Sequence, residues 1–302
     1  MDARIKFRHV SCFLSVANHG SLVGAAQDLC ITQPTVSKTL KELEDILSTR
    51  LFERLPKGVI LTAAGRLFMQ HAGPSFKAME DAIAAVSNVQ EAQASVHIGV
   101  LSTVEAAVIP DVIAAVHRRN PQLTVSTSTG PSDYLLSQLR MGEAELVVGR
   151  LTEANEIRGL AFEQLYAESM QLLVRNEHPL VTETGWALKA LEKYPLVLPT
   201  KKTIIRHYAD QLFAQHNIQQ SHQRLETLSP AMSFGYLNQT DALWIAPASV
   251  ARPYLEREQA VALSVPDSQT HGAVGVCFNE SYPLSEGAVL FCDVLREYCK
   301  QL

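Results

Sequence analysis

The sequence predicts three parts: a small helical domain that ends in a β-hairpin, a long connecting helix, and a two-lobed α/β domain. Three observations predict this order. Apolar stripes at helical spacing precede a short hairpin pattern, residues 63–93 are almost all helix-forming, and from residue 96 strand and helix patterns alternate. At 302 residues with 47% apolar composition, the chain can bury more than one core.

Residues 21–47 predict two short helices joined by a tight turn. The first runs from about Ser21 to Leu29, with Ser21 as N-cap. The second begins at Gln33, and we expect Thr32 to cap this helix. Pro34 then falls in the first turn, where the backbone N–H that proline lacks is not needed. Its inner face repeats at helical spacing through Val36, Leu40, Leu43 and Leu47.

The opposite face of this second helix is polar, and it carries Gln33, Thr35, Ser37, Lys38 and Lys41. Glutamine can pair bidentately with adenine, and lysine suits guanine or phosphate. A helix-turn-helix places such a face in the major groove. Taken alone, the segment also fits an ordinary amphipathic helix pair with a solvated face.

The neighbouring segments favour the DNA-binding interpretation. An upstream apolar stripe supplies a third helix: Phe7, Val10, Phe13, Leu14 and Ala17. Downstream, residues 51–62 predict a hairpin, or wing, with Arg54 and Lys57 at its edge. Residues 1–66 hold nine Lys and Arg against six Asp and Glu, so this part is +3, and the remainder of a chain of net charge −5 is −8. A basic head on an acidic body is expected where only one end meets phosphate.

The stretch from Phe7 to about Phe68 resembles the winged helix-turn-helix of LysR-type transcriptional regulators, through segments 21–26, 32–38, 43–44, 51–54 and 61–65. The resemblance implies base or backbone contacts from Gln33, Pro34, Thr35, Ser37 and Lys38, and contacts of Arg54 and Lys57 with flanking DNA. Ser21 and Lys41 complete the predicted DNA-binding set. Two positions depart from the family pattern, Gly24 where a basic residue is common and Lys38 where Arg is frequent, and lysine lacks the rigid fork of arginine.

The connecting helix is expected over residues 63–93, with Thr62 as its cap and Pro74 bending or interrupting it near its start. Its apolar residues follow the spacing of a coiled-coil seam: Ala72, Phe76, Met79, Ile83 and Val86. This stripe could pack on its own domain. We favour a dimerisation helix, which would present two heads to two-fold related half-sites.

From residue 94 to 302 the patterns predict strands at 96–100, 123–127, 146–149, 171–174, 196–198, 243–245 and 272–276, with helices at 105–117, 132–141, 203–216, 229–238 and 285–300. Alternation of this kind predicts parallel strands with crossover helices. We expect lobe I at about 94–161 and 267–302, and lobe II at about 162–266, after a DNA-binding domain at 1–62 and a linker at 63–93. The resemblance implies a fold like that of periplasmic binding proteins, with an inducer held between the lobes.

The expected inducer site lies where strands give way to helices, because helix N-termini attract anions. These junctions supply Ser102, Thr103, Pro131, Ser132, Thr200, Lys202 and Thr203. Each hydroxyl could instead be a simple N-cap. Four nearby residues could wall an aromatic ring of the ligand or belong to the core: Phe234, Tyr236, Trp244 and Pro247. The effector half is similar to regulators of aromatic-compound degradation, so a small aromatic carboxylate or sulfonate is the expected inducer.

Other functional classes find little support in the sequence. There is no apolar run of membrane-spanning length and no signal-peptide pattern, so we expect a cytoplasmic protein without a membrane partner. Five scattered cysteines are expected to be buried, reduced thiols. No zinc, nucleotide-binding or nucleophile-elbow motif is present, and His178 beside Pro179 fits a turn better than a catalytic base. We therefore expect no enzyme, no metal and no cofactor.

Three hypotheses follow: a ligand-responsive regulator, a solute-binding protein whose N-terminal helices only dimerise, and an enzyme with an unrecognised site. The first is preferred. Its expected partners are double-stranded DNA, a small anionic effector and other copies of the chain, as a dimer through the linker helix and, as the resemblance implies, a homotetramer. RNA polymerase is a further candidate partner.

Overall fold

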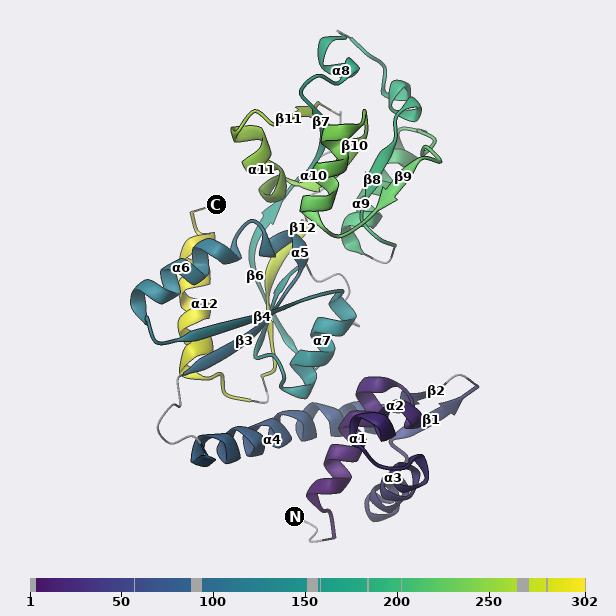
Figure 1. Cartoon of the computed structure of the whole chain (residues 1–302), viewed down its shortest axis with the longest axis vertical. Helices are drawn as coiled ribbons and strands as arrows, with labels where there is room; N and C mark the ends of the chain where they lie inside the picture. Colours follow the sequence, from purple (N-terminus) through teal and green to yellow (C-terminus); the bar gives the residue numbers. More distant parts are fainter. Residues whose placement is uncertain are drawn as a thin grey trace.

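The computed structural model describes residues 4–56, 58–87, 94–150, 157, 159–183, 185–201, 203–264, 272–280 and 282–301. Figure 1 shows three regions along the long axis: the N-terminal helices with their hairpin, a first α/β lobe in the middle, and a second lobe at the far end. A long helix, α4, lies between the N-terminal domain and the first lobe. The predicted fold class is confirmed.

The N-terminal domain packs three helices against a two-stranded wing. Its elements are α1 (Phe7–His19), α2 (Leu22–Asp28), α3 (Gln33–Leu47), β1 (Phe52–Leu55) and β2 (Gly58–Leu61). Phe13 lies at the centre, fully buried, and its ring contacts those of Phe52 and Phe68. Val36 and Leu43 on α3 are also fully buried, as their helical spacing predicts. The apolar stripes therefore converge on one small core.

Two of the three expected helix caps form. Ser21 Oγ accepts a hydrogen bond from the backbone N–H of Gly24 at 3.0 Å, and Thr62 Oγ1 accepts one from Gly65 at 2.9 Å. Thr32 occupies the N-cap position of α3, but its hydroxyl is 2.8 Å from the hydroxyl of Thr35 and makes no cap bond. The expectation that Thr32 caps α3 with its side chain is wrong, because its hydroxyl bonds to the hydroxyl of Thr35 instead.

Helix α4 (Ala63–Ser87) continues through Pro74, so of the two expected effects of this proline, a bend or an interruption, the interruption is wrong. Gly73 and Pro74 lie against the end of α7 in the first lobe. A Cβ on Gly73 would fall 2.6 Å from Cα of Met141, so glycine permits this close approach. Gln70 Nε2 also donates to the carbonyl of Gly159 at 3.1 Å, and the Tyr282 hydroxyl donates to the carbonyl of His71. The first half of the helix is thereby fixed to lobe I.

The first lobe is built on a five-stranded sheet of order β4-β3-β5-β12-β6. Its elements are β3 (Ser95–Val100), α5 (Ser102–Glu105), α6 (Ile109–Arg119), β4 (Thr124–Thr129), α7 (Ser132–Met141), β5 (Leu146–Gly149), β6 (Ala161–Glu168), β12 (Gly272–Phe278) and α12 (Glu286–Cys299). Strands β3, β4 and β5 are parallel, whereas β12 runs antiparallel to β5 and β6. Alternate residues of β3 and β5 face the core beneath α6 and α12, and Val147 faces α7.

The second lobe holds a five-stranded sheet of order β11-β7-β10-β8-β9. Its elements are β7 (Met170–Arg175), α8 (Pro179–Thr182), a 3-10 helix (Leu188–Lys193), β8 (Leu196–Leu198), α9 (Ile204–Gln215), β9 (Arg224–Glu226), α10 (Pro230–Gln239), β10 (Leu243–Pro247), α11 (Ala248–Glu256) and β11 (Ala260–Leu263). Strands β8, β9 and β10 are parallel, and β7 runs antiparallel to β10 and β11. Apolar side chains alternate between a core under α9 and a core under α10 and α11.

The chain crosses between the lobes twice. Strand β6 ends at Glu168 in the first sheet, and β7 begins at Met170 in the second. The expected start of lobe II at residue 162 is therefore wrong, because β6 pairs with β12 and belongs to lobe I. The return from β11 to β12 spans residues 265–271, which lie outside the described residues, and with them the expected return at 267.

Candidate nucleic-acid interface and effector site

The start of α3 presents the expected polar face. Gln33, Pro34, Thr35, Lys38 and Lys41 are exposed and Ser37 is half-buried. The buried side chains of the same helix pack on α1 and α2, which leaves the first turns of α3 projecting from the domain. The structure thus brings together the expected contact residues of this helix on one surface.

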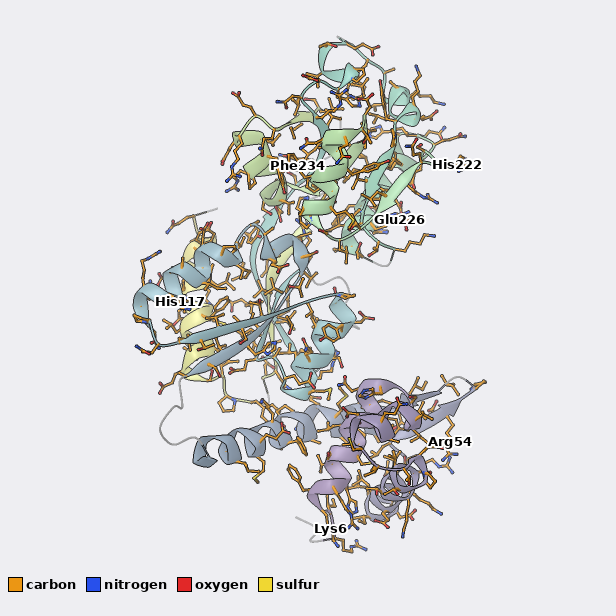
Figure 2. All side chains as sticks on the ribbon, in the orientation of Figure 1. Lys6, Arg54, His117, His222, Glu226 and Phe234 are labelled. Carbon is orange, nitrogen blue, oxygen red and sulfur yellow. The ribbon has the colours of Figure 1, made fainter. Side chains whose placement is uncertain are left out.

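The wing is held against α3 and the turn before α2. Glu44 Oε1 accepts hydrogen bonds from the backbone N–H groups of Leu51 at 2.7 Å and Phe52 at 3.2 Å. The N–H of Val59 donates to the carbonyl of Gly20 at 2.8 Å. Strand β1 therefore begins at a position fixed by a carboxylate of α3, and its exposed Arg54 lies beside that helix (Figure 2).

A groove of about 730 Å³ runs between α3 and the wing, and Ser37, Lys41 and Arg54 are among its lining residues. Lys57, expected at the wing edge, lies outside the described residues. The hydroxyl of Ser21 is used as the cap of α2. Its DNA contact remains a prediction.

A carboxylate of α3 itself, Glu42, limits the positive charge of the head. Glu42 lies 3.3 Å from His9 Nε2 and 3.4 Å from Arg8 Nη2. The hydrogen bond with His9 lowers the pKa of Glu42 most, and the nearby charges of Arg8 and Lys38 lower it further. Lys38 therefore stands near a carboxylate, although its own side chain is exposed.

In lobe I the expected junctions lie at the carboxyl ends of the parallel strands. Ser102 and Thr103 open α5 directly after β3, and both are half-buried. The buried hydroxyl oxygen of Thr103 has no hydrogen-bond partner in the described part of the chain. Pro131 is the N-cap residue of α7, exposed, and Ser132 begins that helix.

In lobe II the junction after β8 behaves as a helix cap. Thr203 Oγ1 accepts from the N–H of Arg206 at 3.2 Å and donates to the carbonyl of Thr200 at 2.9 Å. The lysine expected between them, Lys202, lies outside the described residues. Helix α11 begins after Pro247 and contacts α5, which opens at Ser102 and Thr103, so these two helices meet across the lobes.

The aromatic side chains expected to wall the ligand form part of the lobe II core. Phe234 stacks on Tyr254 with ring centroids 4.1 Å apart, and Trp244, 5% exposed, contacts the edge of the same ring. Figure 2 shows Phe234 within the second lobe. The sequence left open whether these side chains wall a ligand or belong to the core, and their ring contacts favour the core.

A buried polar cluster, which the sequence did not predict, lies at the crossing between the lobes. Arg150 directly follows β5 and is fully buried, and its Nη2 lies 2.6 Å from Glu168 Oε1 at the end of β6. The other oxygen of Glu168 accepts from the N–H of Ser249, in the first turn of α11, at 2.7 Å. Tyr166 interacts with Ser249 through its hydroxyl, and burial, followed by the charge of Glu168, raises the pKa of Tyr166.

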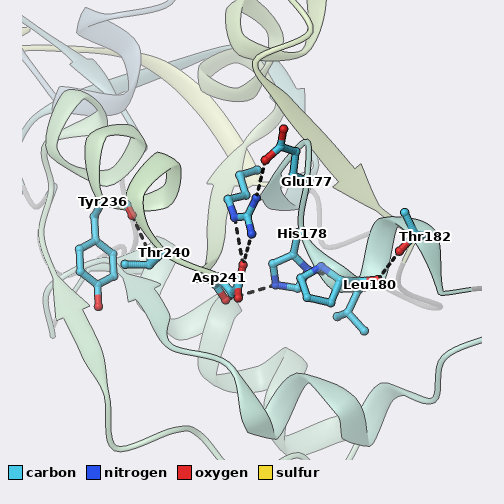
Figure 3. Close-up of polar contacts among 9 residues, drawn as sticks. Glu177, His178, Leu180, Thr182, Tyr236, Thr240 and Asp241 are labelled. Carbon is cyan, nitrogen blue, oxygen red and sulfur yellow. Dashed lines mark hydrogen bonds and ion pairs between the residues drawn. The ribbon is translucent and has the colours of Figure 1, made fainter.

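His178, which looks catalytic in the sequence, has a structural role. Its Nδ1 accepts from the N–H of Leu180 at 3.1 Å, and its Nε2 is 3.2 Å from the carbonyl oxygen of Asp241 (Figure 3). Those two bonds require the neutral imidazole with its proton on Nε2. Burial lowers the pKa of His178, which favours that neutral form.

The remaining candidates for chemistry are sparse. Cys12, Cys277, Cys292 and Cys299 are buried free thiols as expected, whereas the expectation is wrong for Cys30, which is exposed in the turn before α3. Within the described ranges, His, Cys, Asp and Glu side chains nowhere gather in threes that could hold a metal ion. Among the helices that the structure describes, none is long and apolar enough to cross a membrane.

Comparison with known proteins matches both halves of the chain to family models. Residues 7–66 match the bacterial regulatory helix-turn-helix protein, lysR family, and residues 90–300 match the LysR substrate binding domain. The HTH-type transcriptional regulator PcaQ of Agrobacterium fabrum is 33% identical over 303 residues, covering 100% of this chain and 97% of PcaQ.

Solved full-length structures share the fold. LysG of Corynebacterium glutamicum with bound effector Arg aligns with a TM-score of 0.66 at 16% identity, covering 98% of this chain and 99% of LysG. Full-length CbnR in complex with its target DNA aligns with a TM-score of 0.56 at 19% identity, covering 97% and 100%. Both likenesses extend over the N-terminal domain, the long helix and the two lobes.

Proposed function

Because the chain belongs to the LysR family of bacterial helix-turn-helix transcriptional regulators, we propose that it binds a partly palindromic promoter site and responds to a small aromatic anion. The anion is a carboxylate or sulfonate held between the two lobes. Helix α3 reads the DNA and the lobes sense the ligand. The family is one of transcriptional regulators, and the proposal assigns no catalytic step to the chain.

The observation that carries the DNA-binding part is the free polar face of α3 beside the wing. Gln33, Thr35 and Lys38 are exposed there, while the apolar residues of the same helix are buried. Exposed donors at the start of a helix that projects from a small domain suit base edges and phosphates. The solved complex of CbnR with its target DNA supports the same use of this fold.

Dimerisation through α4 supports the partly palindromic site. Ala72 is buried and Phe76 stacks on Phe7 within the same chain at 4.3 Å, so this half of the stripe is covered. Met79 and Ile83 are 52% and 57% exposed. Apolar side chains at seam positions of a long helix are suited to a second copy of the helix. Val86, the last seam position, has no described side chain.

An anionic ligand is supported by the junctions that face the crossing. The N-termini of α9 and α11 carry Thr203 and Ser249, and helix N-termini favour negative charge. LysG, with its bound effector Arg, shows that a protein of this fold holds a small charged molecule. The aromatic character rests on the resemblance of the effector half to regulators of aromatic-compound degradation, including the toluenesulfonate-pathway regulator.

The DNA-binding part is tested by a gel shift on the DNA that flanks the gene for this chain. We expect Gln33→Ala to weaken binding by about 1 to 3 kcal/mol at its own site and to relax sequence preference. Lys38→Ala should reduce affinity and make binding less salt-dependent. Lys300→Ala, exposed at the end of α12, is the control. If both head variants bound as wild type does, the head would serve only dimerisation and the proposal would fail.

A further inference from the structure

Among the described residues, the buried arginine at the lobe crossing differs from a second buried arginine, Arg206. Arg206 is 6% exposed, and it donates to Asp210 at 2.9 Å, to Glu226 at 3.0 Å and to the carbonyl of Pro199 at 3.1 Å. Arg150 is 0% exposed, yet none of its three nitrogens makes a hydrogen bond within the described residues. Its contact with Glu168 is an ion pair without hydrogen-bond alignment.

Unfilled donors on a buried guanidinium are unfavourable, since five N–H groups lose their water. Glu168 neutralises the charge of Arg150 but leaves Nε and Nη1 unused. The hydroxyls of Tyr166 and Ser249 are also buried, and apart from their interaction with each other they have no partner in the part of the chain that the structure describes. Several orphaned polar groups around one cation indicate a site that a polar ligand completes.

The guanidinium lies between groups from both lobes. Arg150 extends from the end of β5 in lobe I, and its Nη1 occupies the space beside Gly272, where a Cβ would fall 2.1 Å away. The same Cβ would be 3.1 Å from the ring of Tyr208 on α9 of lobe II. Gly272 therefore makes room for the guanidinium where the chain returns to lobe I.

Glu168 joins this cation to the other lobe. One carboxylate oxygen meets Arg150 at 2.6 Å, and the second accepts from the N–H of Ser249 at the start of α11. The carbonyl of Ser169 accepts from the N–H of Ala248 at 3.0 Å, so the crossing strand is tied to the same helix. A carboxylate at a helix N-terminus is stable there even without an arginine.

We propose that Arg150 binds the carboxylate or sulfonate group of the effector and that Glu168 occupies the guanidinium until the effector enters. This rests on the proposed function. Glu168 gives up Nη2 of Arg150 while its bond to α11 remains, and the incoming anion takes Nη2 together with Nε or with Nη1, the two donor pairs that a guanidinium can present to one anion. A planar, bidentate donor is suited to a carboxylate or a sulfonate. The exchange alters the link between lobe I and α11, which is where the two lobes meet.

The test compares acid binding in four full-length proteins by thermal shift and titration calorimetry. Probes are benzoate, 4-hydroxybenzoate and 4-toluenesulfonate, with benzamide as the neutral match. Arg150→Met removes the cation. Glu168→Gln keeps an acceptor for Ser249 and removes the competing charge. Glu163→Gln is the matched control, because Glu163 lies on the same strand as Glu168 but pairs with Arg296, at 2.8 Å, and not with Arg150.

We expect an acid, and not benzamide, to raise the melting temperature of wild type and Glu163→Gln, because a ligand of the native state stabilises it. Arg150→Met should lose at least about tenfold in affinity for that acid, and Glu168→Gln should bind it more tightly. If Arg150→Met does not fold, the Glu168→Gln result decides. Unchanged affinity in both variants would overturn the role of Arg150 and leave the proposed function intact. Acids without effect on any of the four proteins would overturn both.

Discussion

His178 is placed so that its neutral form is part of the fold. Its Nδ1 accepts the first N–H of α8, and a proton on that nitrogen would remove this cap. Burial lowers the pKa of His178 below its ordinary value of 6.5. The unfolded chain therefore takes up a proton at a higher pH than the folded chain does, and stability falls as pH drops below about 6.5 toward the folded pKa.

We therefore expect urea unfolding of lobe II to become easier between pH 7 and pH 5, with His178→Gln losing part of this pH dependence. Both tryptophans of the chain, Trp186 and Trp244, lie in that lobe, so their fluorescence follows the transition. His222→Gln, at an exposed position, is the control. Equal pH dependence in His178→Gln and wild type would contradict the assigned role.

At the scale of single residues, the sequence was informative where local chemistry decides. The Ser21 cap and the buried positions of α3 follow from spacing and residue type. Arg150, Glu168 and Ser249 did not stand out, because nothing near them in sequence is distinctive. The sheet topology brings them together from three separate segments, so a buried charge after a strand was the one available signal.

The wing depends on an element contact that spacing alone does not reveal. Glu44 of α3 accepts the N–H groups of Leu51 and Phe52, which precede and begin β1. We expect Glu44→Ala to cost about 1 to 2 kcal/mol, since hydrogen bonds to a charged group are strong but this one is half-exposed. Hydrogen exchange at the two amides should quicken and DNA affinity should fall.

Asp45→Ala, at an exposed neighbouring position, is the control for Glu44→Ala. Exchange rates at Leu51 and Phe52 that stayed at the wild-type value would show that the carboxylate does not hold the wing.

Helix α4 divides into a half packed on its own chain and a half that exposes apolar side chains. If Met79 and Ile83 meet a second copy, charges there will separate the chains, because buried like charges repel. We expect Met79→Glu with Ile83→Glu to sediment as a monomer, whereas wild type and Ser75→Glu sediment as a dimer or larger. Wild-type sedimentation of the double variant would place the dimer contact elsewhere.

Elements were predictable where apolar periodicity is strong, and α7, β5 and β8 have the expected bounds. Strands β6, β9 and β11 were missed. Strand β9 is short and polar, and β6 lacks a clear alternation because it is half-buried along its length. The sequence also did not reveal that β7 runs antiparallel to β10 and that β12 runs antiparallel to β5. These directions follow from the two crossings between the lobes, which the fold sets and local sequence patterns do not.

Across the whole molecule, the packing gives a continuous path from the lobe crossing to the head. The sheet of lobe I carries Arg150 at one end of β5, and α7 of that lobe contacts α4 at Gly73 and Met141. Met141 also belongs to the apolar cluster of the N-terminal domain. A shift of lobe I on ligand binding would therefore act on the helix that joins the DNA-reading domain.

We expect ligand binding and DNA binding to be coupled through this path. The most direct measurement is the anisotropy of labelled DNA flanking the gene, titrated with wild-type protein with and without the acid that gives the largest thermal shift. We expect the acid to change DNA affinity and benzamide to leave it unchanged, and we expect DNA to change acid affinity by the same factor. Tight binding of both DNA and acid, with neither affecting the affinity of the other, would contradict the coupling.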